Sequence, residues 1–183
     1  MLRRLALALL VTAVACGGGT KKVATPITTA PGAPNITILS DFSGGGAIPK
    51  QYTCDSANQS PPLQFVNVPQ EAASLALQVQ DIDTPTKFVH WLVYNVDPHT
   101  RSLAAGQAPL HATQGTNSFG KPGYGGPCPP AGQRHRYVFT LLALSTQLNV
   151  SESVSPNDLW ATLERSGSIA RGQLTGTYQR PGS

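Results

Sequence analysis

Charged residues are scarce in this sequence: only 12% of its 183 residues are Asp, Glu, Lys or Arg, about half the proportion typical of globular proteins. The apolar content of 40% excludes an intrinsically disordered chain. The 18 glycines and 16 prolines follow no period, which excludes collagen and a coiled coil and favours a loop-rich, mainly β protein. The apolar run at residues 5–14 covers only part of a bilayer core, so we do not expect a permanent transmembrane helix.

Several common catalytic and metal-binding motifs are also missing. The sequence contains no GxSxG nucleophile elbow, no HExxH zinc motif and no CxxC pair. We therefore expect neither an enzyme, nor a metal site, nor a bound cofactor.

The net charge of +4 comes from the N-terminal region. From residue 35 onward, nine basic and nine acidic residues balance, and the remaining positive charges are Arg3, Arg4, Lys21 and Lys22. With a neutral domain, the nucleic-acid binding that a basic chain would suggest loses its main support. Nucleic acid is therefore not an expected partner.

The first 34 residues have the pattern of an exported protein. Arg3 and Arg4 precede the apolar run, which predicts a signal peptide over residues 1–15. The ending Ala-Val-Ala-Cys16 resembles a lipobox, with Cys16 as the lipidated residue, although cleavage without lipidation fits the same residues. Residues 16–34 are rich in Gly, Thr, Pro and Ala and predict a flexible tether before a folded domain at 35–183. We expect a cell-envelope lipoprotein that contacts the membrane through its lipid anchor only, or else a secreted or periplasmic protein.

Two cysteines remain in the predicted domain, Cys54 and Cys128. An even pair in an exported protein suggests a disulfide. The alternative is a pair of unpaired thiols.

Hydrophobic patterns predict five strands and one helix. The strands are expected at residues 35–39, 61–68, 75–80, 88–96 and 136–144, the last two with little alternation, as in central strands covered on both faces. Ser155 can cap a helix that begins at Pro156 and ends before Gly167. The fold class is therefore mainly β: an antiparallel β-sandwich with one or two short helices near the C-terminus.

Polar residues gather at three strand ends beside a Gly/Pro-rich stretch without strand-like runs, residues 106–132. Asp81 and Asp83 are two apart and should share a face, as should His135 and Tyr137, while His90 lies in the strand between. Singly, each has an ordinary explanation as a turn or core residue. Together, at strand ends beside a long loop, they predict a small pocket.

Three segments resemble the signatures of the phosphatidylethanolamine-binding protein family, in its bacterial and archaeal Raf-kinase-inhibitor-like branch. These segments are IPKQYTCDSANQSPPLQF, DIDTPTKFVHWLVYNVDP and NSFGKPGYGGPCPPAGQRHRYVFTLLAL. The resemblance implies a two-sheet β-sandwich with an anion pocket. Its ligand-binding residues fall on Asp81, Asp83, His90, His135 and Tyr137, and its rim on Pro127, Cys128, Pro129 and Pro130. Ile82 and Thr84 depart from the family's DPDAP motif, and residues 167–170 lack the histidine of its C-terminal segment, which leaves the packing of a C-terminal helix there open.

The chemistry of such a pocket favours binding over turnover. Imidazolium groups at His90 and His135 would donate to phosphate oxygens, and nearby aspartates would raise the histidine pKa values. We expect a binding and regulatory module for a small anionic or zwitterionic ligand such as phosphate or phosphoethanolamine, compatible also with a protein partner. The alternatives are an inhibitor of a serine protease or kinase, from the resemblance alone, and a hydrolase using the Asp/His pocket.

Overall fold

The computed structural model describes residues 35–150 and 154–182. The predicted signal peptide, tether and Cys16 lie outside the described residues. The elements are β1 (Thr37–Leu39), the one-turn 3-10 helix η1 (Lys50–Tyr52), β2 (Leu63–Val66), β3 (Ser74–Asp81), β4 (Phe88–Val96), β5 (Ser102–Leu103), β6 (Thr113–Gln114), β7 (Arg134–Leu144), α1 (Pro156–Arg165) and β8 (Ser168–Gln179).

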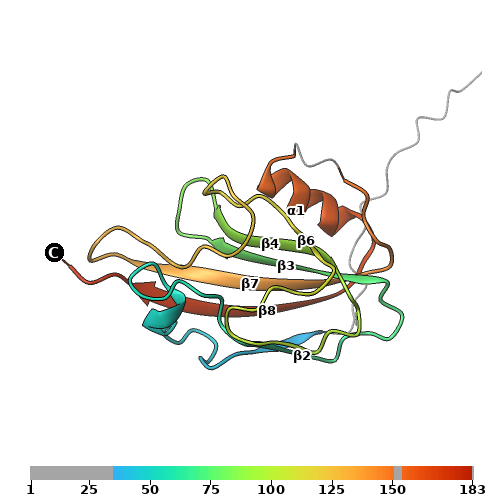
Figure 1. The fold of residues 1–183 in the computed structure, drawn as a ribbon, viewed down its shortest axis with the longest axis horizontal. Coiled ribbons are helices and arrows are strands. Elements are labelled where there is room, and N and C mark those ends of the chain that lie inside the picture. Colours follow the sequence, from blue (N-terminus) through green and yellow to red (C-terminus); the bar gives the residue numbers. More distant parts are fainter. Residues whose placement is uncertain (1–34, 151–153, 183) are drawn as a thin grey trace, which may run out of the picture.

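The strands form two antiparallel sheets, which confirms the predicted fold class. One sheet has the order β6-β4-β3-β7-β8 and the other β1-β2-β5. Figure 1 shows α1 on one face of the five-stranded sheet and β2 on the other. The large sheet is thus covered on both faces, which explains why β4 and β7 lack an alternating pattern.

Two apolar clusters hold these layers together. Between the sheets, Leu75, Leu77 and Val79 of β3 pack with Phe139 and Leu141 of β7, among others. On the opposite face, side chains of the sheet pack against the helix residues Leu159, Trp160 and Leu163. Helix α1 therefore stabilises the outer face of the sheet and leaves the inner face to the sandwich core.

Helix α1 begins and ends as the sequence predicts. The Ser155 hydroxyl accepts a hydrogen bond of 3.2 Å from the Asp158 backbone N–H, and Pro156 occupies the first turn. Gly167 follows the helix with a φ of +88°, a left-handed conformation that favours glycine. It is the single α-helix among residues 35–150 and 154–182.

Strand β8 was not predicted, and the segment after Gly167 is a strand instead of a further helix. Its buried positions alternate, but two of the inward residues are Gly172 and Gly176. A Cβ at Gly176 would lie 2.5 Å from Ile48 Cγ1, and one at Gly172 would collide with the Ile36 carbonyl. The close approach of the N-terminal segment requires glycine there, and this removes the apolar alternation by which a strand is recognised.

Candidate functional site

The candidate site lies at the end of the five-stranded sheet where β3 ends and β4 begins. In the strand register, Asp81 is opposite Phe88 on β4 and Tyr137 on β7. Residues directly opposite one another share a face, and Tyr137 belongs to the core between the sheets. Asp81 therefore faces the interior, with 3% of its surface exposed.

A hydrogen-bonded pair, Asp81 and His135, forms the polar centre of the site. The Asp81 Oδ2 and His135 Nδ1 atoms are 2.7 Å apart, and the two side chains are 4% and 11% exposed. Because a carboxylate only accepts, Nδ1 carries the proton of this hydrogen bond. The second ring nitrogen of His135 lies 3.3 Å from the Gln133 side-chain oxygen. This hydrogen bond orients the imidazole and gives the buried carboxylate a donor.

Asp83 does not share a face with Asp81, contrary to the sequence prediction. Strand β3 ends at Asp81, so the two-residue alternation does not continue into the turn. The Asp83 carboxylate accepts from the Arg136 backbone N–H at 2.7 Å and from the Arg136 guanidinium. These hydrogen bonds hold the pKa of Asp83 below its usual range. Asp83 thus forms a surface pair with Arg136, and Asp81 is the carboxylate of the interior.

His90 reaches the inner face through a β-bulge. Val79 pairs with Trp91 but the next residue, Gln80, pairs with Val89, so His90 is an extra residue in β4. A bulge redirects side chains, and here His90 and Trp91 both point inward. The His90 ring lies 5.2 Å from the Tyr137 ring, edge to face. Its Nδ1 is 2.7 Å from the Gly125 carbonyl oxygen and is therefore the donor.

The electrostatics of His90 differ from the predicted imidazolium. Burial, as the largest cause, lowers the pKa of His90, because desolvation disfavours the charged form. With Nδ1 protonated and bound to Gly125, the other ring nitrogen of the neutral imidazole is an acceptor. His90 therefore offers an acceptor where the sequence suggested a second cationic donor.

Tyr137 has a fully buried hydroxyl without a hydrogen-bond partner among the described residues. Burial, and then the nearby Asp81 carboxylate, raise its pKa well above the usual value. The carboxylate and the Cys128 backbone influence the hydroxyl without the geometry of a hydrogen bond. A buried donor of this kind costs free energy until an acceptor pairs with it.

The rim loop, residues 127–130, is fixed to the segment around η1. Cys128 is joined to Cys54 by a disulfide, the pairing that the cysteine count suggests. The Cys54 backbone N–H donates to the Pro127 carbonyl at 3.1 Å, and the Gly126 N–H donates to Asn58 Oδ1 at 2.7 Å. Pro127 and Pro129 are buried, whereas Cys128 and Pro130 are exposed. The loop is thus held in place before any ligand arrives.

Two phenylalanines complete the site and were not among the predicted residues. The rings of Phe88 and Phe119 are 4.7 Å apart, and the Phe119 ring is 5.4 Å from the His90 ring. Phe119 belongs to the Gly/Pro-rich loop and is 45% exposed. Phe88 could have been found from its strand register opposite Asp81, but the sequence contains no comparable signal for Phe119.

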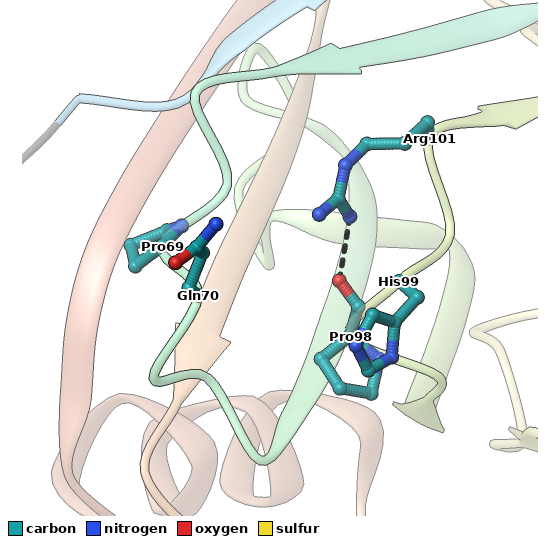
Figure 2. Close-up of a pocket in the computed structure, with 5 residues that line it drawn as sticks. All are labelled: Pro69, Gln70, Pro98, His99 and Arg101. Atoms are coloured by element: carbon teal, nitrogen blue, oxygen red, sulfur yellow. Dashed lines mark hydrogen bonds between the residues drawn. The ribbon is translucent and has the colours of Figure 1, made fainter.

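A separate cavity lies away from the candidate site. A cavity of about 190 Å³ between the β2–β3 and β4–β5 loops is lined by Pro69, Gln70, Pro98, His99 and Arg101 (Figure 2). Antiparallel pairing puts it at the opposite end of β3 from Asp81. Within residues 35–150 and 154–182, no three His, Cys, Asp or Glu side chains group as metal ligands would. No helix in the same ranges is long and apolar enough to span a membrane.

Similar proteins match most of this chain in sequence. A UPF0098 protein of Chlamydia pneumoniae is 46% identical over 145 residues, which is 76% of this chain and 95% of that protein. A UPF0098 protein of Methanothermobacter thermautotrophicus is 42% identical over the same shares.

Solved structures also match this chain in fold. The crystal structure of CT736 from Chlamydia trachomatis, a phosphatidylethanolamine-binding protein homologue, matches with a TM-score of 0.73 and 40% identity over 80% of this chain and 99% of that one. Escherichia coli YbcL matches with a TM-score of 0.72 and 30% identity over 79% of this chain and 98% of that one. The family model described as phosphatidylethanolamine-binding protein matches residues 39–179. The chain therefore belongs to the phosphatidylethanolamine-binding protein family.

Proposed function

We propose that the protein is a binding module for a small phosphate-bearing ligand, held at the Asp81–His135 pair. The hydrogen bond of 2.7 Å between Asp81 and His135 is the observation that carries this proposal. With Nδ1 bound to the carboxylate, an imidazolium at His135 can donate from its second nitrogen to a phosphate oxygen, which would take the place of the Gln133 side-chain oxygen now 3.3 Å from that nitrogen. The unpartnered Tyr137 hydroxyl supplies a further donor on the same face of β7.

The charges of the site favour a zwitterionic or singly charged ligand. Asp81 offsets the charge of a protonated His135, Asp83 is paired with Arg136, and burial favours a neutral His90. The interior therefore holds little excess positive charge. A multiply charged phosphate would be desolvated there without compensation, whereas phosphoethanolamine brings its own ammonium group, for which the neutral His90 is an acceptor.

Calorimetric titration with phosphoethanolamine and with inorganic phosphate tests this proposal. We expect binding of phosphoethanolamine by the wild type and at least a tenfold loss, about 1.4 kcal/mol, in His135→Ala. The matched control is His99→Ala, because His99 is an exposed histidine that also pairs with an aspartate, at the other end of the fold. No binding by the wild type, or equal binding by His135→Ala, would rule the proposal out.

Hydrolysis is the weaker candidate. Ser118 is the serine of the Gly/Pro-rich stretch 106–132, and the hydrogen bond that its Oγ makes in the described structure is to the Val89 N–H, at 2.9 Å, and not to a histidine that could act as its base. A serine protease panel and a phosphodiester hydrolysis assay with the same protein separate inhibition and turnover from simple binding.

We further propose that the module acts outside the cytoplasm, anchored through Cys16. The Cys54–Cys128 disulfide supports export, since disulfides persist in oxidising compartments. Labelling cells with a palmitate analogue should tag the wild type and not Cys16→Ala. Equal labelling of the two proteins would contradict the anchor.

A further inference from the structure

A second cleft borders the open edge of the sandwich, beside the candidate site but lined by other residues. Its volume of about 420 Å³ lies in the range of ligand sites. Its lining comes from residues 57–60, from 106–108 after β5, from Trp91 and Gln114 of β4 and β6, and from 122–124. β5 and β6 are the edge strands of their sheets. The cleft therefore lies where both sheets end.

Three side-chain amides in this lining are held by their oxygen atoms. Gln114 Oε1 accepts from the Trp91 indole N–H at 2.8 Å. Gln107 Oε1 accepts from the Ala104 backbone N–H at 2.9 Å, and Asn58 Oδ1 from the Gly126 backbone N–H at 2.7 Å. Backbone and indole N–H groups only donate, so the orientation of each amide is determined. The nitrogen of each amide is then the group left for a ligand.

The cleft is uncharged, because none of its lining residues is Asp, Glu, Lys, Arg or His. An anion there would lose its hydration without a compensating cation. The matching partner for amide N–H donors is an uncharged acceptor, above all an amide carbonyl.

The neighbouring edge strands indicate that the partner carbonyls belong to the backbone of an extended peptide. Edge strands present backbone N–H and C=O groups on their outer side, to which an extended chain can be added. An extended peptide rises about 3.4 Å per residue, and its carbonyls point alternately to opposite sides. Every second carbonyl can therefore face the amides of Asn58, Gln107 and Gln114.

We propose that this cleft binds a short, uncharged, extended peptide segment, with the three amides donating to its backbone carbonyls. The inference does not depend on the phosphate proposal, because no residue of the Asp81–His135 centre lines the cleft.

An array of N-acetylated hexapeptides without charged residues provides the first test. Sequences retained by the protein are resynthesised with both ends capped and titrated in solution. In wild-type protein, we expect the Trp91 indole N–H resonance to shift on binding. The resonance of Trp160, a residue of α1 that packs against the outer face of the sheet, should stay unchanged. The disaccharide N,N′-diacetylchitobiose, another source of amide carbonyls, is titrated in parallel.

Isosteric substitutions then test the donors. Gln107→Glu and Gln114→Glu keep the anchored oxygen and replace the donating nitrogen with a negatively charged acceptor. We expect at least tenfold weaker peptide binding by both variants. Gln70→Glu adds the same charge beside the separate cavity at the other end of the fold (Figure 2) and should bind as the wild type does.

The proposal is overturned if no capped peptide binds in solution, if both carboxylate variants bind like the wild type, or if only the disaccharide shifts the Trp91 resonance. Phosphoethanolamine titration of the same variants reports on the neighbouring site independently.

Discussion

The disulfide gives the most quantitative prediction of this structure. Cys54 and Cys128 are 74 residues apart in the sequence. In the chain-entropy relation, closing a loop of this length destabilises the unfolded chain by about 4.5 kcal/mol. The double variant Cys54→Ala/Cys128→Ala should therefore lose about 4.5 kcal/mol of unfolding free energy. For a chain of this size, that is a fall in Tm of roughly 9 to 18 °C.

The native contacts around the cross-link should survive in this variant. The Cys54 N–H still donates to the Pro127 carbonyl, and the Tyr124 hydroxyl still donates to the Tyr52 carbonyl at 2.8 Å. We therefore expect an unchanged far-ultraviolet spectrum and retained ligand binding below the melting temperature. Urea denaturation measures the free energy, and reductant should destabilise the wild type without affecting the double variant. A loss below about 1 kcal/mol would show that loop closure does not account for the role of this bond.

Three further predictions concern packing, capping and pH. Gly126→Ala places a Cβ 2.6 Å from Asn58 Oδ1 and should cost about 2–3 kcal/mol of unfolding free energy by overpacking, measured by urea denaturation. The control Gly44→Ala has open space around the new Cβ and should leave the unfolding free energy nearly unchanged. Ser155→Ala removes the helix cap and should cost about 1 kcal/mol in thermal unfolding; an unchanged Tm would contradict the role of the cap. Because burial lowers the pKa of His90, the unfolded chain binds its proton first, so stability should fall as the pH drops below about 6.5. His90→Gln should flatten that slope, and an equal slope in both proteins would refute the assignment.

The sheets and the helix were largely predictable because their signals are local. β4 occupies Phe88–Val96, the range that its run of branched and aromatic residues predicts, and α1 follows its Ser-Pro start and glycine end. β8 was missed because Gly172 and Gly176 replace apolar residues at inward positions, where the N-terminal segment packs against the strand. That requirement comes from a contact between distant parts of the chain.

The sequence predicts part of this side-chain cluster but not its charges. Asp81, His135 and Tyr137 come together as strand alternation implies. Asp83 turns away because β3 ends before it, and Arg136 supplies its partner. His90 joins the site only through a bulge, and its burial in the fold, invisible in the sequence, reverses the expected direction of its pKa shift.

The most direct test of the proposed function is a crystal structure of the protein grown with phosphoethanolamine. We expect the phosphate within hydrogen-bond distance of the His135 imidazole and the Tyr137 hydroxyl, with the Asp81–His135 contact preserved. A phosphate bound elsewhere on the surface, or an interior unchanged and without ligand at saturating concentration, would contradict it.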